Sequence, residues 1–172
     1  MNKLSIGEIL KATNHDFVNQ LQLIKMYLDL NRIDDAKNLI ENYCNQAKTY
    51  SNVCRLQWPK TIEWIQTFQY RFPAIELTLK SNVSVAQNMK KDDETVEYLE
   101  KAIQHVYKHL DPFNDQQLLL EVKSNEEEFK LSFELKGKWN VEPFQNEQLL
   151  YMKVKTIEES TSSWKFVLTF KE

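Results

Sequence analysis

One histidine, His15, has neighbours that suit it to group-transfer chemistry. Neutral imidazole is a good nucleophile near pH 7, because its unperturbed pKa is about 6.5. The carboxylate of Asp16 can fix which ring nitrogen carries the proton, leaving the lone pair of the other nitrogen free. Asn19 and Gln22 share the His15 side of a helix. These four residues fit two interpretations: His15 accepts a phosphoryl group, or it is an exposed histidine without a chemical role. Asn19 and Gln22 could equally be part of a solvated helix face.

The apolar residues around His15 have the spacing of one long helix. It should run from about Ser5, the expected N-cap, to Leu30. Its apolar stripe consists of Ile6, Leu10, Phe17, Leu21, Ile24 and Leu28. At roughly 100° per residue the stripe spans about 60° of arc, and His15 lies about 150° from its centre. We therefore predict that this helix buries its stripe and presents His15, Asn19 and Gln22 on the other side.

A second amphipathic helix is predicted from about Asp35 to Arg55. Its stripe consists of Ala36, Leu39, Ile40, Tyr43, Ala47, Tyr50 and Cys54. The short connection between the two helices predicts an antiparallel hairpin. Two helices with one apolar face each cannot enclose a core, so we predict that two copies of the chain form a four-helix bundle. The alternative is that the C-terminal half of the chain covers the hairpin.

The second half of the chain changes to a pattern of both helices and strands. Because Pro59 can open a helix but cannot continue one, we predict a helical domain over residues 1–56 and a second domain over residues 57–172. Helices are expected at about 60–70 and 94–110, the latter capped by Asp92 or Asp93, strands at 76–81, 118–123, 129–136, 149–158 and 164–171, and an irregular or helical piece at 142–147. This order predicts an antiparallel or mixed sheet with helices on one face, an α/β sandwich, within a chain of the α+β class.

Composition narrows the range of partners. A formal net charge of −3 argues against nucleic acid and anionic membranes as partners. The sequence has no apolar run long enough to span a membrane and no signal-peptide region at its N-terminus. Cys44 and Cys54 should lie about 15 Å apart along one helix, too far to pair, and are typical of thiols in a reducing compartment. We therefore expect a cytoplasmic protein whose partners are proteins.

The remaining histidines, His105 and His109, have the i,i+4 spacing that can hold zinc. No third ligand is evident near them, and no metalloprotease motif surrounds them. We therefore predict an exposed pair and no metal site.

The string from Asn14 to Leu30 resembles a known signalling motif. Its pattern His-Asp-aromatic-x-Asn-x-Leu-Gln-x-Ile is similar to the phospho-acceptor helix of the sporulation initiation phosphotransferase B family. A shorter form, His-Asp-x-x-Asn, occurs in sensor histidine kinases of the citrate-sensing type. The resemblance implies that His15 takes a phosphoryl group from the aspartyl phosphate of one response regulator and passes it to another. Asp16 and Asn19 match supporting polar positions of the motif, and the family name implies a sporulation pathway.

The order of elements in the second domain resembles the ATP-binding domain of histidine kinases, but the nucleotide motifs are missing. Such domains need an asparagine on the long helix, an Asp-x-Gly turn and glycine-rich lid turns, because glycine lets backbone N–H groups approach phosphates. The chain has two glycines, Gly7 and Gly137, and neither follows an aspartate by two positions. No asparagine lies between Asn88 and Asn114. We therefore predict a degenerate kinase domain that does not bind ATP, and no cofactor of the chain's own.

Together these features predict a homodimeric phosphorelay phosphotransferase. His15 would be the covalent carrier, Asp16 its orienting group, and Asn19 and Gln22 contacts to the phosphoryl group or the docked regulator, whose own magnesium and lysine would neutralise charge. The alternative is a non-enzymatic dimeric adaptor that binds a regulator or kinase without being phosphorylated. An ATP-using kinase core is a third possibility, against which the glycine count argues. Covalent phosphate on His15 discriminates between the first two.

Overall fold

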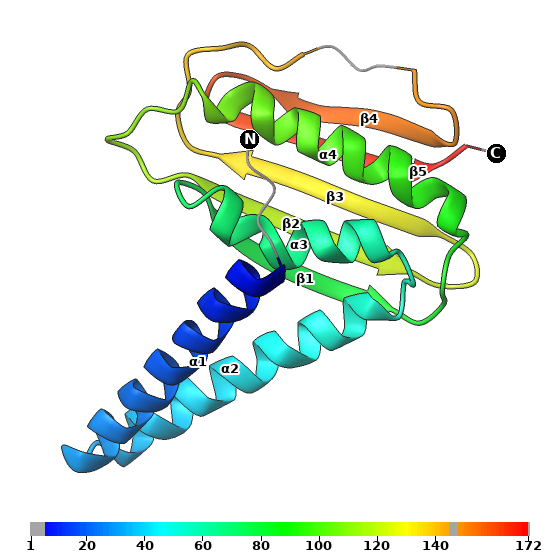
Figure 1. Ribbon diagram of the computed structural model, residues 1–172. Coiled ribbons are helices and arrows are strands. Elements are labelled where there is room, and N and C mark those ends of the chain that lie inside the picture. The colour runs from blue at the N-terminus through cyan, green and yellow to red at the C-terminus, as the bar shows by residue number, and fades with distance from the viewer. Residues whose placement is uncertain (1–5, 145–147, 172) are drawn as a thin grey trace. The chain divides into compact units, whose positions relative to one another are not determined.

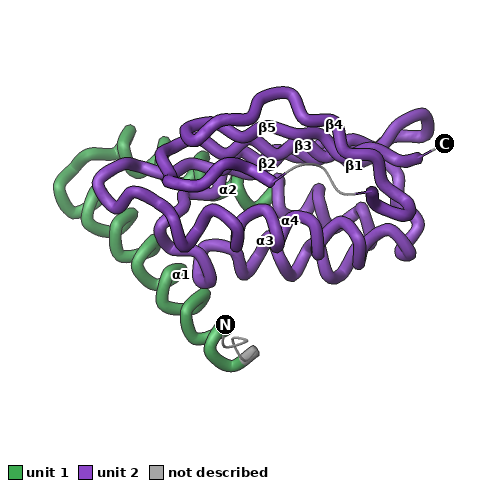
Figure 2. The backbone as a smooth tube through the Cα atoms, turned by 90° about the horizontal axis from the view of Figure 1, so that it is seen from above, with its two compact units in different colours: residues 1–48 green, residues 49–172 purple. Residues whose placement is uncertain are grey.

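The computed structural model describes residues 6–144 and 148–171. The chain divides into two compact units, residues 1–48 and residues 49–172 (Figure 2). The division between the units lies inside the second helix, eight residues before the predicted domain boundary at residue 56. That domain boundary stays a prediction. Ser5, the expected N-cap, and the 145–147 part of the predicted 142–147 piece lie outside the described residues.

The first unit is a helical hairpin. It contains α1 (Ile6–Asp29) and α2 (Ile33–Cys54) as far as Lys48. Asn31 adopts φ 57, a left-handed conformation that asparagine tolerates better than most residues. The Arg32 N–H then donates to the Tyr27 carbonyl over 2.8 Å, which closes the end of α1 and lets α2 start. The predicted pair of long helices with a short connection is present.

The apolar stripe of α1 is not buried in a single chain. Phe17 is 57% exposed and Leu21 is 50% exposed, and Leu10 and Leu28 are also exposed. Ala36 on α2 is the one buried apolar side chain among the described residues of this unit. The hairpin by itself therefore leaves this face of α1 uncovered, and burial of the stripe between two copies of the chain stays a prediction.

The second unit contains a five-stranded mixed sheet in the order β1-β2-β3-β5-β4. Its strands are β1 (Glu76–Val83), β2 (Gln117–Ser124), β3 (Phe129–Lys136), β4 (Met152–Glu159) and β5 (Ser163–Phe170). β1 pairs with β2 in parallel, and all other pairs are antiparallel. The parallel pair requires a crossover, which the helix between these strands supplies. This confirms the predicted mixed sheet.

Two helices, α3 (Pro59–Arg71) and α4 (Asp92–Tyr107), cover one face of this sheet, with the short 3-10 helix η1 (Met89–Lys91) before α4 (Figure 1). Alternation along the strands directs one set of side chains to these helices. The largest fully buried side chains include Trp58, Trp139, Trp164, Phe68, Phe72, Phe133 and Phe166. The second unit is therefore an α/β sandwich with its own core, and the α+β class is confirmed. No helix in the described part of the chain is long and apolar enough to cross a membrane.

Asp92 caps α3 rather than its own helix. The N-cap of α3, Trp58, makes no capping bond, and that of α4 is Lys91. The buried Asp92 carboxylate instead accepts hydrogen bonds from the backbone N–H groups of Lys60 and Thr61, each over 2.8 Å, and from Thr61 Oγ1 over 2.7 Å. The predicted capping role within α4 is thus wrong, because tertiary packing places this carboxylate at the positive end of α3.

The last turn of α2 belongs to the second unit and covers the edge of β1. Asn52 Oδ1 accepts from the Val83 N–H over 2.8 Å, and Asn52 Nδ2 donates to the Val83 carbonyl over 3.3 Å. Ser81 Oγ donates to the Thr49 carbonyl over 2.8 Å. These bonds satisfy backbone groups at a sheet edge that would otherwise be open.

Candidate functional site

The His15 ring lies on the exposed side of α1, and its side chain is 73% exposed. Its Nδ1 atom is 3.5 Å from Asp16 Oδ1 and 3.2 Å from the amide nitrogen of Asn19. Among the described residues, both of these polar neighbours contact Nδ1 and not Nε2. The structure therefore brings the three predicted catalytic residues together on one turn of helix.

These contacts bear on which ring nitrogen of His15 carries the proton. Attack by Nε2 requires the proton to be on Nδ1, and the Asp16 carboxylate is an acceptor that favours this tautomer. Rotation of the Asn19 amide by 180° would present its oxygen to the same proton, since amide and ring orientations are assigned from the hydrogen-bond network. Both neighbours can thus hold the ring with Nε2 as the nucleophile.

Gln22, the predicted partner contact, is exposed on the same side of α1. It lies about 10 Å from His15 along the helix axis, at 1.5 Å per residue. It is therefore too far along the helix to orient the ring, but it lies within the area that a docked protein would cover. The structure does not make Gln22 part of the group around Nδ1.

Sequence reasoning missed two exposed apolar residues of α1 outside the stripe. Val18 is 49% exposed and Met26 is also exposed. At roughly 100° per residue, Met26 lies about 20° from His15 around the helix, nearly opposite the stripe that contains Phe17 and Leu21. Val18 lies about 60° from His15 and about 60° from Leu21, between the two sides. The same helical spacing that located Asn19 and Gln22 could have found them.

The two glycines serve packing or lie in a helix, not in a phosphate-binding lid. Gly7 lies inside α1. Gly137 has φ 154, and a Cβ there would be 1.7 Å from Gln116 Oε1. The buried Gln116 side chain accepts from the Lys138 N–H over 3.0 Å and donates to the carbonyls of Asp111 and Asn114, each over 3.1 Å. Gly137 thus makes room for a side chain that links the loop before β2 to the segment after β3.

The predicted exposed pair is wrong for His105, which is half-buried, whereas His109 is exposed. No group of three or more metal-ligating side chains lies among the described residues. His105 Nε2 lies 2.8 Å from the Glu142 carbonyl oxygen. Its ring packs edge-on against Phe144, which also contacts Tyr98. This side of α4 is therefore occupied by the segment that follows β3.

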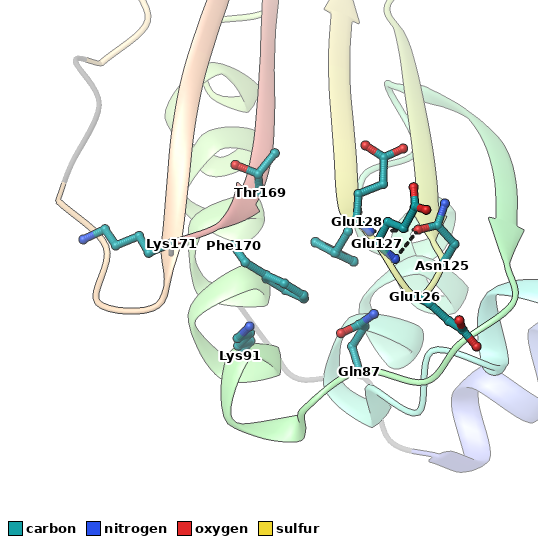
Figure 3. Close-up of a pocket in the computed structure, with 10 residues that line it drawn as sticks. Gln87, Lys91, Asn125, Glu126, Glu127, Glu128, Thr169, Phe170 and Lys171 are labelled. Carbon is teal, nitrogen blue, oxygen red and sulfur yellow. Dashed lines mark hydrogen bonds between the residues drawn. The ribbon is translucent and has the colours of Figure 1, made fainter.

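A hollow of about 490 Å³ lies between η1, the β2–β3 loop and the end of β5 (Figure 3). The Lys91 ammonium lies 3.1 Å from the centre of the Phe170 ring, and burial lowers the pKa of Lys91. Glu126, Glu127 and Glu128 line the opposite wall. None of the predicted site residues lines this hollow, and its opposed charges do not select one ligand.

The helical region matches a known family. Residues 1–56 match the family described as "Sensor_kinase_SpoOB-type, alpha-helical domain". This confirms the resemblance seen in the string from Asn14 to Leu30. The match covers both helices of the hairpin and about a third of the chain, so the SpoOB-type likeness applies to residues 1–56. The sequence matches no curated protein.

Similar solved structures cover nearly the whole chain at low identity. The Acinetobacter baumannii histidine kinase AdeS has 12% identity and a TM-score of 0.44, covering 91% of this chain and 97% of that one. A structure described as a bacterial phosphotransferase has 13% identity and a TM-score of 0.44, covering 97% and 98%. The histidine kinase ThkA, in complex with the response regulator TrrA, has 10% identity and a TM-score of 0.42, covering 96% of this chain and 62% of that one.

Proposed function

We propose that this protein is a phosphorelay phosphotransferase, which accepts a phosphoryl group on His15 from a response-regulator aspartate and passes it to a second regulator. The observation that carries the proposal is the exposed His15 ring within a SpoOB-type domain, with Asp16 and Asn19 both at Nδ1. This arrangement leaves Nε2 as the reacting atom, facing a partner that can approach from solvent.

The transfer forms one bond and breaks another. The lone pair of His15 Nε2 attacks the phosphorus atom, and the bond from phosphorus to the aspartate oxygen breaks as the carboxylate leaves. The proton on Nδ1 stays there, directed to Asp16 at 3.5 Å, so the phosphorylated ring carries a positive charge next to a carboxylate. Attack by an aspartate of the second regulator reverses these steps. Magnesium and a lysine for charge neutralisation would belong to the regulators, so no cofactor is assigned to this chain.

The exposed stripe supports a homodimer. One face of α1 is apolar but exposed to solvent, and it consists of Leu10, Phe17, Leu21 and Leu28. Ile40 on α2 is also exposed. If a second copy of the chain packs on this face, the two hairpins together form a four-helix bundle, which encloses a core that one hairpin cannot. Because His15 lies nearly opposite this stripe, it stays accessible in the dimer.

The second unit is proposed to act without nucleotide. Gly137 makes room for the Gln116 side chain. On α4, the Tyr98 ring contacts Phe144, and the His105 ring contacts the Glu142 carbonyl oxygen. These contacts support a degenerate kinase domain kept as structure. A place in sporulation and a cytoplasmic location stay predictions, as does the alternative of an adaptor that binds regulators without being phosphorylated.

The proposal is tested by a phosphotransfer assay. The purified protein is incubated with response regulators phosphorylated by a small phosphodonor, and acid-labile, alkali-stable label is measured on wild type, His15→Ala and His109→Ala. His109 is an exposed histidine of the second unit and serves as the matched control. We expect label on wild type and on His109→Ala and none on His15→Ala. Wild-type protein that binds a regulator but takes no label would favour the adaptor instead.

A further inference from the structure

One face of the sheet is turned away from α3 and α4 (Figure 2). By strand alternation, this open face carries a cluster of lysines. Strand alternation separates it from the core, since Leu118, Leu120 and Val122 of β2 are buried on the helix side. Five exposed lysines lie toward one end of the open face: Lys80 on β1, Lys123 on β2, Lys130 on β3, and Lys153 and Lys155 on β4. We call these five residues the lysine cluster.

Strand register gathers these lysines at one end of the face. Lys123 lies directly opposite Lys130, and Lys153 pairs with Thr169, which in turn pairs with Lys130. Like charges placed directly opposite each other across a sheet destabilise it. The sheet therefore keeps an arrangement that its own folding does not favour.

The acidic residues on the open face do not balance the cluster. Glu121 lies 3.0 Å from Lys123 and is the carboxylate within the cluster. Glu134, further along β3, pairs with Lys136 at 2.6 Å and with Lys165 at 2.5 Å, two lysines outside the cluster. Among the strand residues at this end of the face, five ammonium groups thus meet one carboxylate, and three further glutamates lie in the adjoining β2–β3 loop.

We propose that the lysine cluster binds a carboxylate-rich surface on a partner protein. An acidic surface would relieve the repulsion between Lys123 and Lys130 and supply counter-charges to Lys80, Lys153 and Lys155. Lysine suits this role because its ammonium is a flexible point charge, whereas the planar recognition of phosphate favours arginine, which is absent from this face. The proposal does not rest on phosphotransfer by His15.

The neighbouring loop favours a protein over a broader polyanion. Lys123 and Lys130 flank the β2–β3 loop, which contains the exposed Glu126, Glu127 and Glu128. An anionic membrane or a nucleic-acid duplex that covered the cluster would also lie over these three glutamates, which repel it. A compact acidic patch on a protein can bind the lysines without contacting the glutamates. The open face also has no aromatic side chain on its strands on which a base could stack.

Binding of a labelled decaglutamate peptide, followed by fluorescence anisotropy at two salt concentrations, tests the proposal. The full chain is compared with the Lys123→Gln/Lys130→Gln variant and with Lys37→Gln/Lys48→Gln, a matched pair of exposed lysines on α2. We expect at least fivefold weaker binding and a smaller salt dependence for the first variant, and less than a twofold change for the control. Decaglutamine should not bind.

Thermal melting of the variants shows whether weaker peptide binding comes from lost charge or from a misfolded protein. Relief of like-charge repulsion predicts that Lys130→Gln alone raises the Tm in the absence of peptide, by about 1–3 °C. Equal peptide affinity of all three proteins would overturn the proposal. It would also be overturned if phosphatidylcholine–phosphatidylserine vesicles or duplex DNA bound more tightly than the peptide with the same dependence on Lys123 and Lys130, since the partner would then be a lipid surface or a nucleic acid.

Discussion

The two units of this protein use apolar residues in opposite ways. In the second unit the helices and the sheet enclose a core that contains Trp58, Trp139 and Trp164 at 1% exposure or less. In the first unit Ala36 is the buried apolar side chain among the described residues, while Phe17 and Leu21 are half-exposed. A sheet and helices can bury one another within one chain, but two helices cannot. The comparison indicates that the second unit is complete alone and that the first requires another surface.

The largest effect is expected where the core is densest. Phe133 stacks on Phe166, with ring centres 4.5 Å apart, and is fully buried. Phe133→Ala should lower the free energy of unfolding of the second unit by about 3–5 kcal/mol, through lost burial and a cavity. Urea denaturation followed by tryptophan fluorescence isolates this unit, because all four tryptophans lie in it. A loss below about 1 kcal/mol would show that the core tolerates the cavity.

A smaller loss is expected at the cap of α3. Asp92→Ala removes the acceptor of three hydrogen bonds and should cost about 2–3 kcal/mol, since it leaves two backbone N–H groups unsatisfied. Asp93→Ala is the matched control, because Asp93 is exposed and pairs with Lys60 at the surface. The control should change stability by less than about 0.5 kcal/mol in the same urea titration. Equal losses in the two variants would refute the capping role.

The first unit should respond in association rather than in folding of the core. Leu21→Ser lies on the exposed stripe, and Met26→Ser, on the His15 side, has similar exposure and serves as the control. We expect Leu21→Ser to weaken dimerisation at least tenfold in sedimentation equilibrium, because each copy loses a buried leucine. Met26→Ser should leave the dimer unchanged. A monomeric wild type at all concentrations would exclude the four-helix bundle.

The smallest effect concerns surface charge in the second unit. Hydrogen bonds from Lys136 and Lys165 lower the pKa of Glu134 from its ordinary value of 4.5. A carboxyl whose pKa is lower in the folded state stabilises the fold above pH 4.5 and loses this contribution as pH falls through its folded pKa. Glu134→Gln should therefore lower the Tm by about 1–3 °C at pH 7, and the difference should vanish in acid. A difference that persists at pH 2 would point to packing instead.

The elements themselves could be located from the sequence. The helix predicted at 60–70 is α3 (Pro59–Arg71), and the strand predicted at 129–136 is β3 (Phe129–Lys136). The start of β4 at Met152 is later than predicted, because Glu94 of α4 accepts hydrogen bonds from the N–H groups of Tyr151 and Met152, each over 2.9 Å. Such a contact joins residues more than 50 positions apart, so local pattern could not reveal it.

The sequence by itself determined the group around His15. Asp16 and Asn19 are one and four residues away, and any helix with this sequence places them at the same ring, since helix geometry is set by neighbouring residues. The tertiary structure alone decided that Asp92 caps α3 and that β1 pairs in parallel with β2. The physical reason is that capping between helices and strand register depend on how distant segments pack, whereas the side of a helix on which a residue lies depends on spacing alone.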